Sequence, residues 1–177
     1  GDPENAPTMV LAAQVHREAG RLAAASRLLD EALRVDPRSP EAWNERGGIA
    51  LAEEKPAEAL EHFRQALSAS PDRLHALLNA AQTAAQVNRA DVAEEYYRRA
   101  RAAHPRSGDA ANGLGLLLAK AGRAAEAEAL LREAVRLEPG MGTAWNNLAV
   151  LLLRNGRRGE AAAAIEAINT NYRQQCE

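Results

Sequence analysis

The chain has 177 residues, of which 46% are hydrophobic, so it is long enough and apolar enough to bury a core and is not disordered. Alanine and leucine dominate this apolar share and aromatic residues make up only 3%, a composition that favours helices over strands and predicts an all-α protein. The formal net charge of -2 gives no reason to expect nucleic acid or an anionic membrane surface as a partner.

The sequence also restricts membrane association. No run of about 18 apolar residues is present, so direct membrane insertion is not expected. The first residues, GDPENAPT, lack the charged-then-apolar pattern of a signal peptide. The single Cys176 cannot form an internal disulfide, and both the cytoplasm and the bacterial periplasm stay open as locations.

Prolines recur at a fixed interval of 34 residues, which indicates an internal repeat. The prolines of this column are Pro37, Pro71, Pro105 and Pro139. Counting from Ala6, the interval divides a single array over 1–177 into units 6–39, 40–73, 74–107, 108–141 and 142–175. Each unit is predicted to hold two helices of about 12 to 14 residues joined by a tight turn.

Four further columns support this division. Small residues stand at Ala25, Ala59, Ala93, Ala127 and Ala161, and again at Ala32, Ala66, Ala100 and Ala134, where two helices would approach closely. Large residues on the same helical face stand at Leu29, Phe63, Tyr97, Leu131 and Ile165. The expected turns are at Gly20, Glu54, Asn88, Gly122 and Gly156. Gly and Asn accept the left-handed conformation that ends a helix; Glu54 is the exception, and Pro56 would start the next helix there.

The second and fifth units carry the most specific pattern. In EAWNERGGIALAEEKPAEALEHFRQALSASP the key positions are Trp43, Gly47, Ala59, Phe63, Ala66 and Pro71; in the fifth unit they are Trp145, Leu148, Ala149, Gly156, Ala161 and Ile165. Over nearly the whole chain these columns resemble the tetratricopeptide repeat (TPR) family. The resemblance implies a right-handed α-solenoid of five helix-turn-helix repeats, about ten helices, in which the first helix of each pair lines a concave groove.

The fifth unit is degenerate. Ile168 replaces the second small residue, Arg173 stands at the proline position, and an apolar stripe continues through Ile165, Ile168 and Tyr172. One interpretation is that this stripe packs on the preceding helices. The other is an association face that joins a further segment or a second copy of the chain, which would give a homo-oligomer.

No pattern for catalysis, metal binding or cofactor binding is found, so we predict a non-enzymatic protein without a cofactor. The four histidines, His16, His62, His75 and His104, occupy different positions of the repeat. Cys176 has no histidine-based constellation beside it, and Leu118 replaces the third glycine of a phosphate-binding motif in GLGLLLAKAG.

A basic residue follows each expected turn. These residues are Arg21, Lys55, Arg89, Arg123 and Arg157. Cations near helix C-termini offset the helix dipole, which explains such a row without a partner. An anionic partner along this edge is the alternative.

The groove positions implied by the family are rich in amides and small side chains. The predicted peptide contacts are Asn44, Asn79, Asn112, Asn146 and Asn147, with Leu78, Gln82, Leu116, Val150 and Leu153 around them. The groove resembles in part the TPR array of O-linked N-acetylglucosamine transferases, whose asparagine ladder holds peptide backbone; Asn79 and Asn147 match the ladder, whereas Leu11, Glu45 and Gly113 depart from it. Side-chain amides both donate and accept hydrogen bonds. The simpler interpretation is that these asparagines bond local backbone or the neighbouring repeat.

The leading functional hypothesis is a non-catalytic scaffold that binds a peptide or helical segment of a partner protein in its groove. The first alternative is the targeting domain of a larger enzyme, such as a glycosyltransferase or sulfotransferase. The second is an assembly subunit of a bacterial envelope complex, suggested by the composition rich in alanine and arginine.

Overall fold

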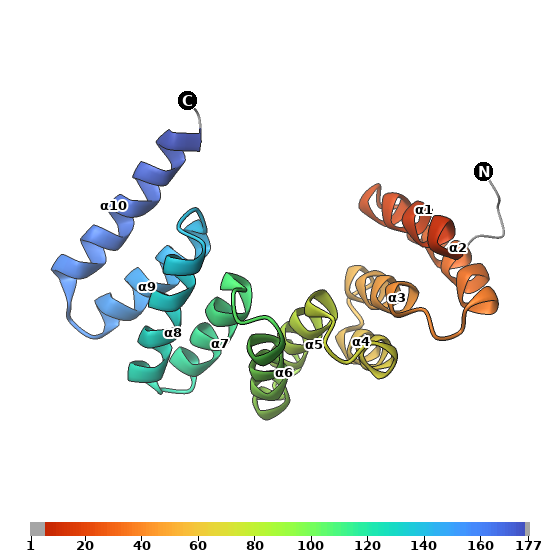
Figure 1. Cartoon of the computed structure of the whole chain (residues 1–177), viewed down its shortest axis with the longest axis horizontal. Coiled ribbons are helices and arrows are strands. Elements are labelled where there is room, and N and C mark those ends of the chain that lie inside the picture. The colour runs from red at the N-terminus through yellow and green to blue at the C-terminus, as the bar shows by residue number, and fades with distance from the viewer. Residues whose placement is uncertain (1–5, 176–177) are drawn as a thin grey trace. The chain divides into compact units, whose positions relative to one another are not determined.

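The protein is helical throughout the part of the chain that the computed structural model describes, residues 6–175, with side chains described for residues 6–170. The helices are α1 (Ala6–Glu18), α2 (Leu22–Val35), α3 (Pro40–Ala52), α4 (Pro56–Ala69), α5 (Leu74–Gln86), α6 (Ala90–Ala103), α7 (Gly108–Lys120), α8 (Ala124–Leu137), α9 (Gly142–Arg154) and α10 (Arg158–Gln175) (Figure 1). No strand occurs within residues 6–175. The predicted all-α solenoid of five helix pairs is therefore confirmed.

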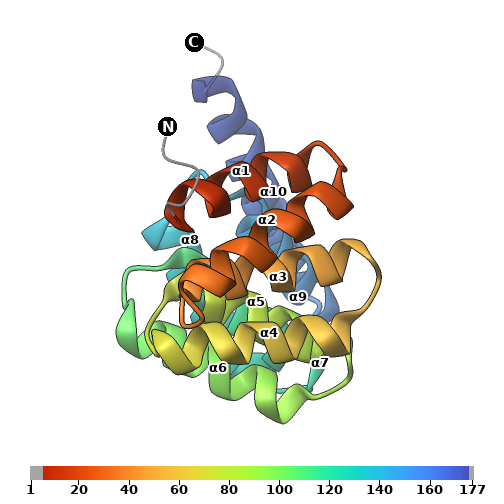
Figure 2. The ribbon, with the colours of Figure 1, turned by 90° about the vertical axis from the view of Figure 1, so that its right-hand side faces the viewer.

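The helix pairs follow the repeat closely, since α1, α3, α5, α7 and α9 begin at the first residues of the five predicted units. The helices group into two compact units, an N-terminal unit (Gly1–Ala93) and a C-terminal unit (Glu94–Glu177), divided within α6. In the N-terminal unit the α1–α2 pair lies above the α3–α4 pair in the view of Figure 2, and both α1 and α2 contact α3. The assignment of the whole chain to one continuous array stays a prediction.

All five turns within the helix pairs adopt the same backbone geometry. The residue at the turn has a φ between +59° and +79°, and the next residue donates its N–H to a carbonyl five positions earlier, as in Lys55 to Ala50 at 2.8 Å. This combination is the Schellman motif, which satisfies carbonyl groups left open at a helix end. Glu54 also adopts a positive φ, 60°, in this motif. Its backbone conformation is therefore the same as that of the glycines and the asparagine at the other four turns.

Proline and tryptophan act together at the start of the second and fifth units. The indole Nε1 of Trp43 donates to the carbonyl of Pro37 at 2.9 Å, and that of Trp145 donates to the carbonyl of Pro139 at 2.8 Å. Each bond ties the first helix of a unit to the loop that precedes it. Trp145 is half-buried and Leu148 is only 2% exposed, so both are packing residues, as expected.

The core consists of the predicted columns. All nine alanines of the two small-residue columns are at most 1% exposed. In the large-residue column Leu29, Phe63 and Leu131 are fully buried, whereas Ile165 keeps 46% of its surface exposed. Ile168 is half-buried, and its methyl group lies 3.9 Å from the position of a Cβ on Gly142. The side chain of Tyr172 lies outside the described residues.

Glycine is required where an aromatic ring packs on the first helix of a pair. A Cβ on Gly47 would lie 2.3 Å from Cε1 of Phe63, and a Cβ on Gly113 would lie 2.3 Å from Cε1 of Tyr97. Such separations are far below van der Waals contact, so the rings occupy the space that any other side chain would need.

We expect Gly47→Ala to destabilise the protein by about 1 to 3 kcal/mol, because Phe63 must move out of its packed position. Alanine usually stabilises a helix by about 1 kcal/mol relative to glycine, so a loss of stability isolates the clash. Urea unfolding followed by circular dichroism measures the effect. Gly159→Ala on α10, where nothing lies within 4 Å of the new Cβ, is the matched control; equal unfolding midpoints for the two variants would contradict the packing argument.

Candidate functional site

The inner helices of the N-terminal unit carry a hydrogen-bonded asparagine pair. Asn79 on α5 donates from Nδ2 to Oδ1 of Asn44 on α3, over 3.1 Å, and both side chains are half-buried. The pair borders a hollow of about 340 Å³, here called the N-terminal hollow. Its lining residues are Val10, Gln14, Glu41, Asn44, Glu45, Arg73, His75 and Asn79.

The charges around the N-terminal hollow are paired with one another. Arg17 on α1 donates from Nε to Oε2 of Glu45 at 3.0 Å, and Arg73 forms an ion pair with Glu41. Burial alone would raise the pKa of Glu41, but its backbone hydrogen bond and Arg73 hold that pKa below its usual value. Both carboxylates already have a cation beside them, so the other polar groups of the lining are the amides of Gln14, Asn44 and Asn79 and the imidazole of His75.

The C-terminal unit repeats the asparagine pair. Asn147 on α9 donates from Nδ2 to Oδ1 of Asn112 on α7, over 2.9 Å. The neighbouring hollow, here called the C-terminal hollow, has a volume of about 80 Å³. Its lining residues are Leu116, Ala119, Lys120, Leu131, Asn147, Val150, Leu151 and Arg154.

The C-terminal hollow is more apolar than the N-terminal one. Leu116 is 36% exposed and Val150 41% exposed, and Leu153 on the same helix as Val150 is 48% exposed. The cations at its border, Lys120 and Arg154, have no ion pair among the described residues. This arrangement offers apolar contact next to uncompensated positive charge.

The structure brings together four of the five predicted asparagines, in two pairs. Asn146 is exposed, and its side chain makes no hydrogen bond within the described residues. Of the other predicted contacts, Leu78 is half-buried on α5 and Gln82 is exposed on the same helix. Sequence reasoning expected bonds to neighbouring repeats in general but missed the specific pairs. The signal for them is an interval of 35, one more than the repeat, between Asn44 and Asn79.

The row of basic residues is largely satisfied within the C-terminal unit. Arg123 bonds Glu94 of the preceding repeat at 2.7 Å and Glu126 of its own helix at 2.7 Å. Arg157 likewise bonds Glu128 at 2.6 Å and Glu160 at 2.7 Å. Each guanidinium thus joins two successive repeats through carboxylates, which explains these two members of the row without an anionic partner.

These bonds shift the protonation equilibria of their partners. The hydrogen bond from Arg123 holds the pKa of Glu126 below its usual value, and the bond from Arg157 does the same to the pKa of Glu160. A carboxylate whose pKa is lowered on folding stabilises the fold while ionised, and this contribution disappears when the pH falls through the folded-state pKa.

Residues 6–175 contain no group of three or more His, Cys, Asp or Glu side chains arranged to hold a metal ion. Within the same residues, no helix is long and apolar enough to cross a membrane.

Comparison with known families defines the class of the protein as a helical-repeat, protein-interaction module. A family profile described as tetratricopeptide repeat matches residues 10–73 and 78–142, and a second profile of the same description matches residues 118–176. The chain belongs to the tetratricopeptide repeat family. No curated protein matches the sequence. The finer resemblance to the glycosyltransferase array stays a prediction.

Solved TPR structures share the fold over nearly the whole chain. The structure from a functional characterisation of Pseudomonas aeruginosa pilF has a TM-score of 0.86 at 20% identity, covering 94% of this chain and 76% of that one. PilW, described as a widely conserved type IV pilus biogenesis factor, has a TM-score of 0.85 at 25% identity, covering 95% and 78%. YrrB, described as a TPR protein with an unusual peptide-binding site, has a TM-score of 0.73 at 21% identity, covering 96% and 88%.

We expect the C-terminal unit to lose stability below about pH 5, because protonation of Glu160 removes its bond to Arg157. Glu160→Gln, which cannot ionise, should show a smaller drop in unfolding midpoint between pH 6 and about pH 3.5 than the parent. The measurement is thermal unfolding at several pH values. Glu166→Gln, an exposed change on the same helix, should retain the drop of the parent; the same drop in Glu160→Gln would refute the role of this bond.

Proposed function

We propose that this chain is a non-catalytic scaffold that holds a peptide or helical segment of a partner protein against the asparagine pairs of its inner helices. The observation that carries the proposal is that the same hydrogen-bonded asparagine pair occurs twice in the chain. Asn44–Asn79 and Asn112–Asn147 have the same bond, the same direction and the same place in their helices; both members of the first pair line the N-terminal hollow, and Asn147 of the second lines the C-terminal hollow.

Each pair retains hydrogen-bonding capacity. In the first pair, Asn79 uses one Nδ2 hydrogen and Asn44 uses one Oδ1 lone pair. The amide nitrogen of Asn44 and the amide oxygen of Asn79 have no partner among the described residues, and the same groups of Asn112 and Asn147 are open in the second pair. One donor next to one acceptor matches the N–H and C=O groups of an extended peptide. The internal bond fixes both side chains in position, which lowers the entropy cost of binding.

The C-terminal hollow adds side-chain selectivity to this backbone recognition. Leu116, Val150 and Leu153 provide exposed apolar surface, and Lys120 and Arg154 supply positive charge beside it. This combination favours a partner segment in which an apolar residue is followed by an acidic one. YrrB, which has the same fold, is itself described as having a peptide-binding site.

A role as an assembly subunit of a bacterial envelope complex is a second proposal. Its support is the likeness to PilW, described as a type IV pilus biogenesis factor, at 25% identity over 95% of this chain. Deletion of the gene in its own organism, followed by electron microscopy of the cell surface, tests this role. Normal pili in the deletion strain would exclude a role in pilus assembly.

Peptide display on the purified chain should enrich peptides whose affinity falls at least about tenfold when Asn112, Asn146 and Asn147 are changed to alanine together, because several polar contacts of about 0.5 to 1.5 kcal/mol each are lost. Asn169→Ala, an exposed change on α10, is the matched control and should leave affinity unchanged. Circular dichroism checks that the triple variant stays folded. Equal affinity of the enriched peptides for the parent and the folded triple variant would reject the asparagine mechanism.

Leu153→Ser should weaken the same peptides about fivefold, since the residue is 48% exposed and contributes apolar surface to the binding face. The stability of the free protein should change little because the side chain is already half in water. Isothermal titration calorimetry with an enriched peptide measures the affinity. Leu11→Ser, a change at a 63% exposed leucine of α1, serves as the control for general surface polarity; an equal loss in both variants would contradict a specific apolar contact at Leu153.

A further inference from the structure

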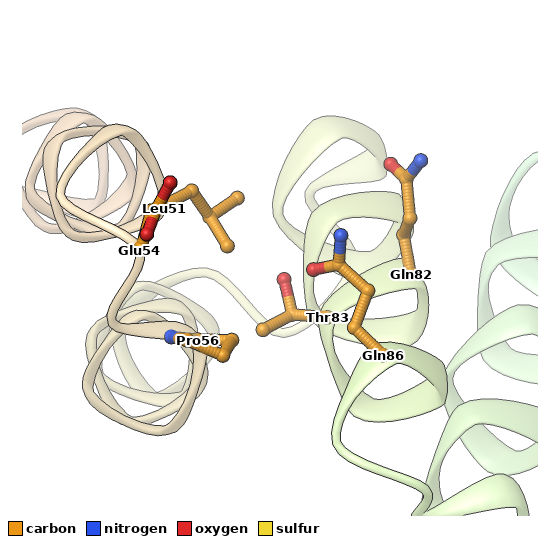
Figure 3. A pocket seen from close by; sticks show the side chains of 6 residues that line it. All are labelled: Leu51, Glu54, Pro56, Gln82, Thr83 and Gln86. Carbon is orange, nitrogen blue, oxygen red and sulfur yellow. The ribbon is translucent and has the colours of Figure 1, made fainter.

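A second hollow in the N-terminal unit lies next to the turn between α3 and α4. It has a volume of about 450 Å³ and is here called the turn pocket. Its lining residues are Leu51, Glu54, Pro56, Gln82, Thr83 and Gln86 (Figure 3). The first three come from the α3–α4 turn and its flanks, and the last three come from α5, so the pocket opens between successive repeats.

Thr83 is a buried polar residue in the wall of the turn pocket. It is only 1% exposed, and its hydroxyl has no hydrogen-bond partner among the described residues. In Figure 3 the hydroxyl points from α5 into the space between Leu51 and Gln86. A buried hydroxyl without a partner destabilises a fold, so a ligand group that reaches this oxygen recovers a bond that the free protein lacks.

The other polar groups of the turn pocket offer open acceptors. The carboxylate of Glu54 and the amides of Gln82 and Gln86 make no side-chain hydrogen bond within the described residues. The adjacent cation, Lys55, is engaged by Glu53 at 2.7 Å. None of the described lysines or arginines lines the pocket, so Glu54 gives it an uncompensated negative charge.

An apolar wall completes the pocket. The side chains of Leu51 and Pro56 point from the α3–α4 region toward α5 in Figure 3, facing the methyl group of Thr83. A ligand that fits both parts has an aliphatic stem for this wall and a head that donates hydrogen bonds and carries positive charge. Carboxylate or phosphate groups are disfavoured, because they would meet Glu54 without any cation to bind them.

We propose that the turn pocket binds the cationic side chain of a lysine or arginine in the partner segment. The stem lies along Leu51 and Pro56, while the head group is attracted to the Glu54 carboxylate and donates to the Thr83 hydroxyl or the Gln86 amide oxygen. This inference rests on the proposed function, since it names one side chain that the partner segment supplies. It also explains why a glutamate stands at a turn position where other units have glycine or asparagine.

The test is a two-dimensional NMR titration of the full chain with Nα-acetyl-lysine methylamide and Nα-acetyl-arginine methylamide, up to about 50 mM, following the backbone amides of Glu54, Thr83 and Gln86. Saturable shifts with either compound support the pocket, and the stronger binder identifies its preferred head group. The uncharged norleucine analogue should bind at least about fivefold more weakly. Equal shifts with norleucine, stronger shifts with the glutamate analogue, or no saturable shift at all would overturn the proposal.

Protein variants assign the effect to the named groups. Glu54→Gln removes the charge at constant size, and Thr83→Val removes the hydroxyl at nearly constant shape; each should weaken the lysine analogue about fivefold. Glu31→Gln, which makes the same change of net charge at an exposed site on α2, should bind like the parent. Equal affinity of the parent and both pocket variants would refute the assignment, and the chemical-shift spectrum shows whether each variant is folded.

The two proposals fail separately. Peptides that depend on the asparagines and bind Glu54→Gln as tightly as the parent would uphold the proposed function and reject the cationic pocket. Saturable lysine binding in the turn pocket, without any peptide enriched in display, would uphold the pocket chemistry and reject the scaffold role.

Discussion

The left-handed turn inside each helix pair is the constraint on which the rest of the structure depends. A three-residue connection between helices is possible only if one residue takes a positive φ and the next reaches back to a carbonyl five positions earlier, as Gly122 and Arg123 do with Leu118. The turn fixes the rotation of the second helix relative to the first. The two alanine columns, both on the second helix of each pair, are then buried, and the ring of Phe63 lies over Gly47 on the first helix of its own pair.

The same turn determines where the charged residues lie. The residue after the left-handed position is the N-cap of the following helix, so a long basic side chain there extends over the preceding repeat. Arg123 and Arg157 use this position to bond one carboxylate on each side. Lys55 stands at the equivalent position but bonds its near neighbour Glu53, which leaves Glu54 unpaired at the edge of the turn pocket.

Sequence reasoning predicted the fold well because the repeat is read from spacing alone. The interval of 34 located the start of each helix pair, and the small and large columns identified the core down to single residues such as Ala25 and Leu131. The burial of residues in the last helix pair was harder to predict, since Ile165 belongs to the large-residue column and is nevertheless 46% exposed. The column specifies which face a residue occupies but not whether another helix covers that face.

The candidate sites were only partly predictable, for a related reason. The role of the asparagines in binding stays a prediction, and their pairing was not predicted, because each pair links different columns of adjacent repeats and the 34-residue interval does not relate its two members. The turn pocket combines residues from a turn and from the middle of a helix in the next repeat. Thr83 gave no signal in the sequence because a threonine within an alanine-rich helix has the pattern of an ordinary core residue; its unpaired oxygen is a property of three-dimensional packing.

The arginine bonds between repeats have a consequence for how such a chain can grow. The fourth repeat contains both kinds of partner in these bonds. Arg123 bonds a carboxylate of the third repeat, and Glu128 accepts a bond from Arg157 of the fifth repeat. A tandem copy of residues 108–141 would therefore meet its own complement at each new junction. Duplication of this segment would preserve the arginine bonds at each new junction without any substitution of their residues, so the fourth repeat is a natural starting sequence for building longer arrays.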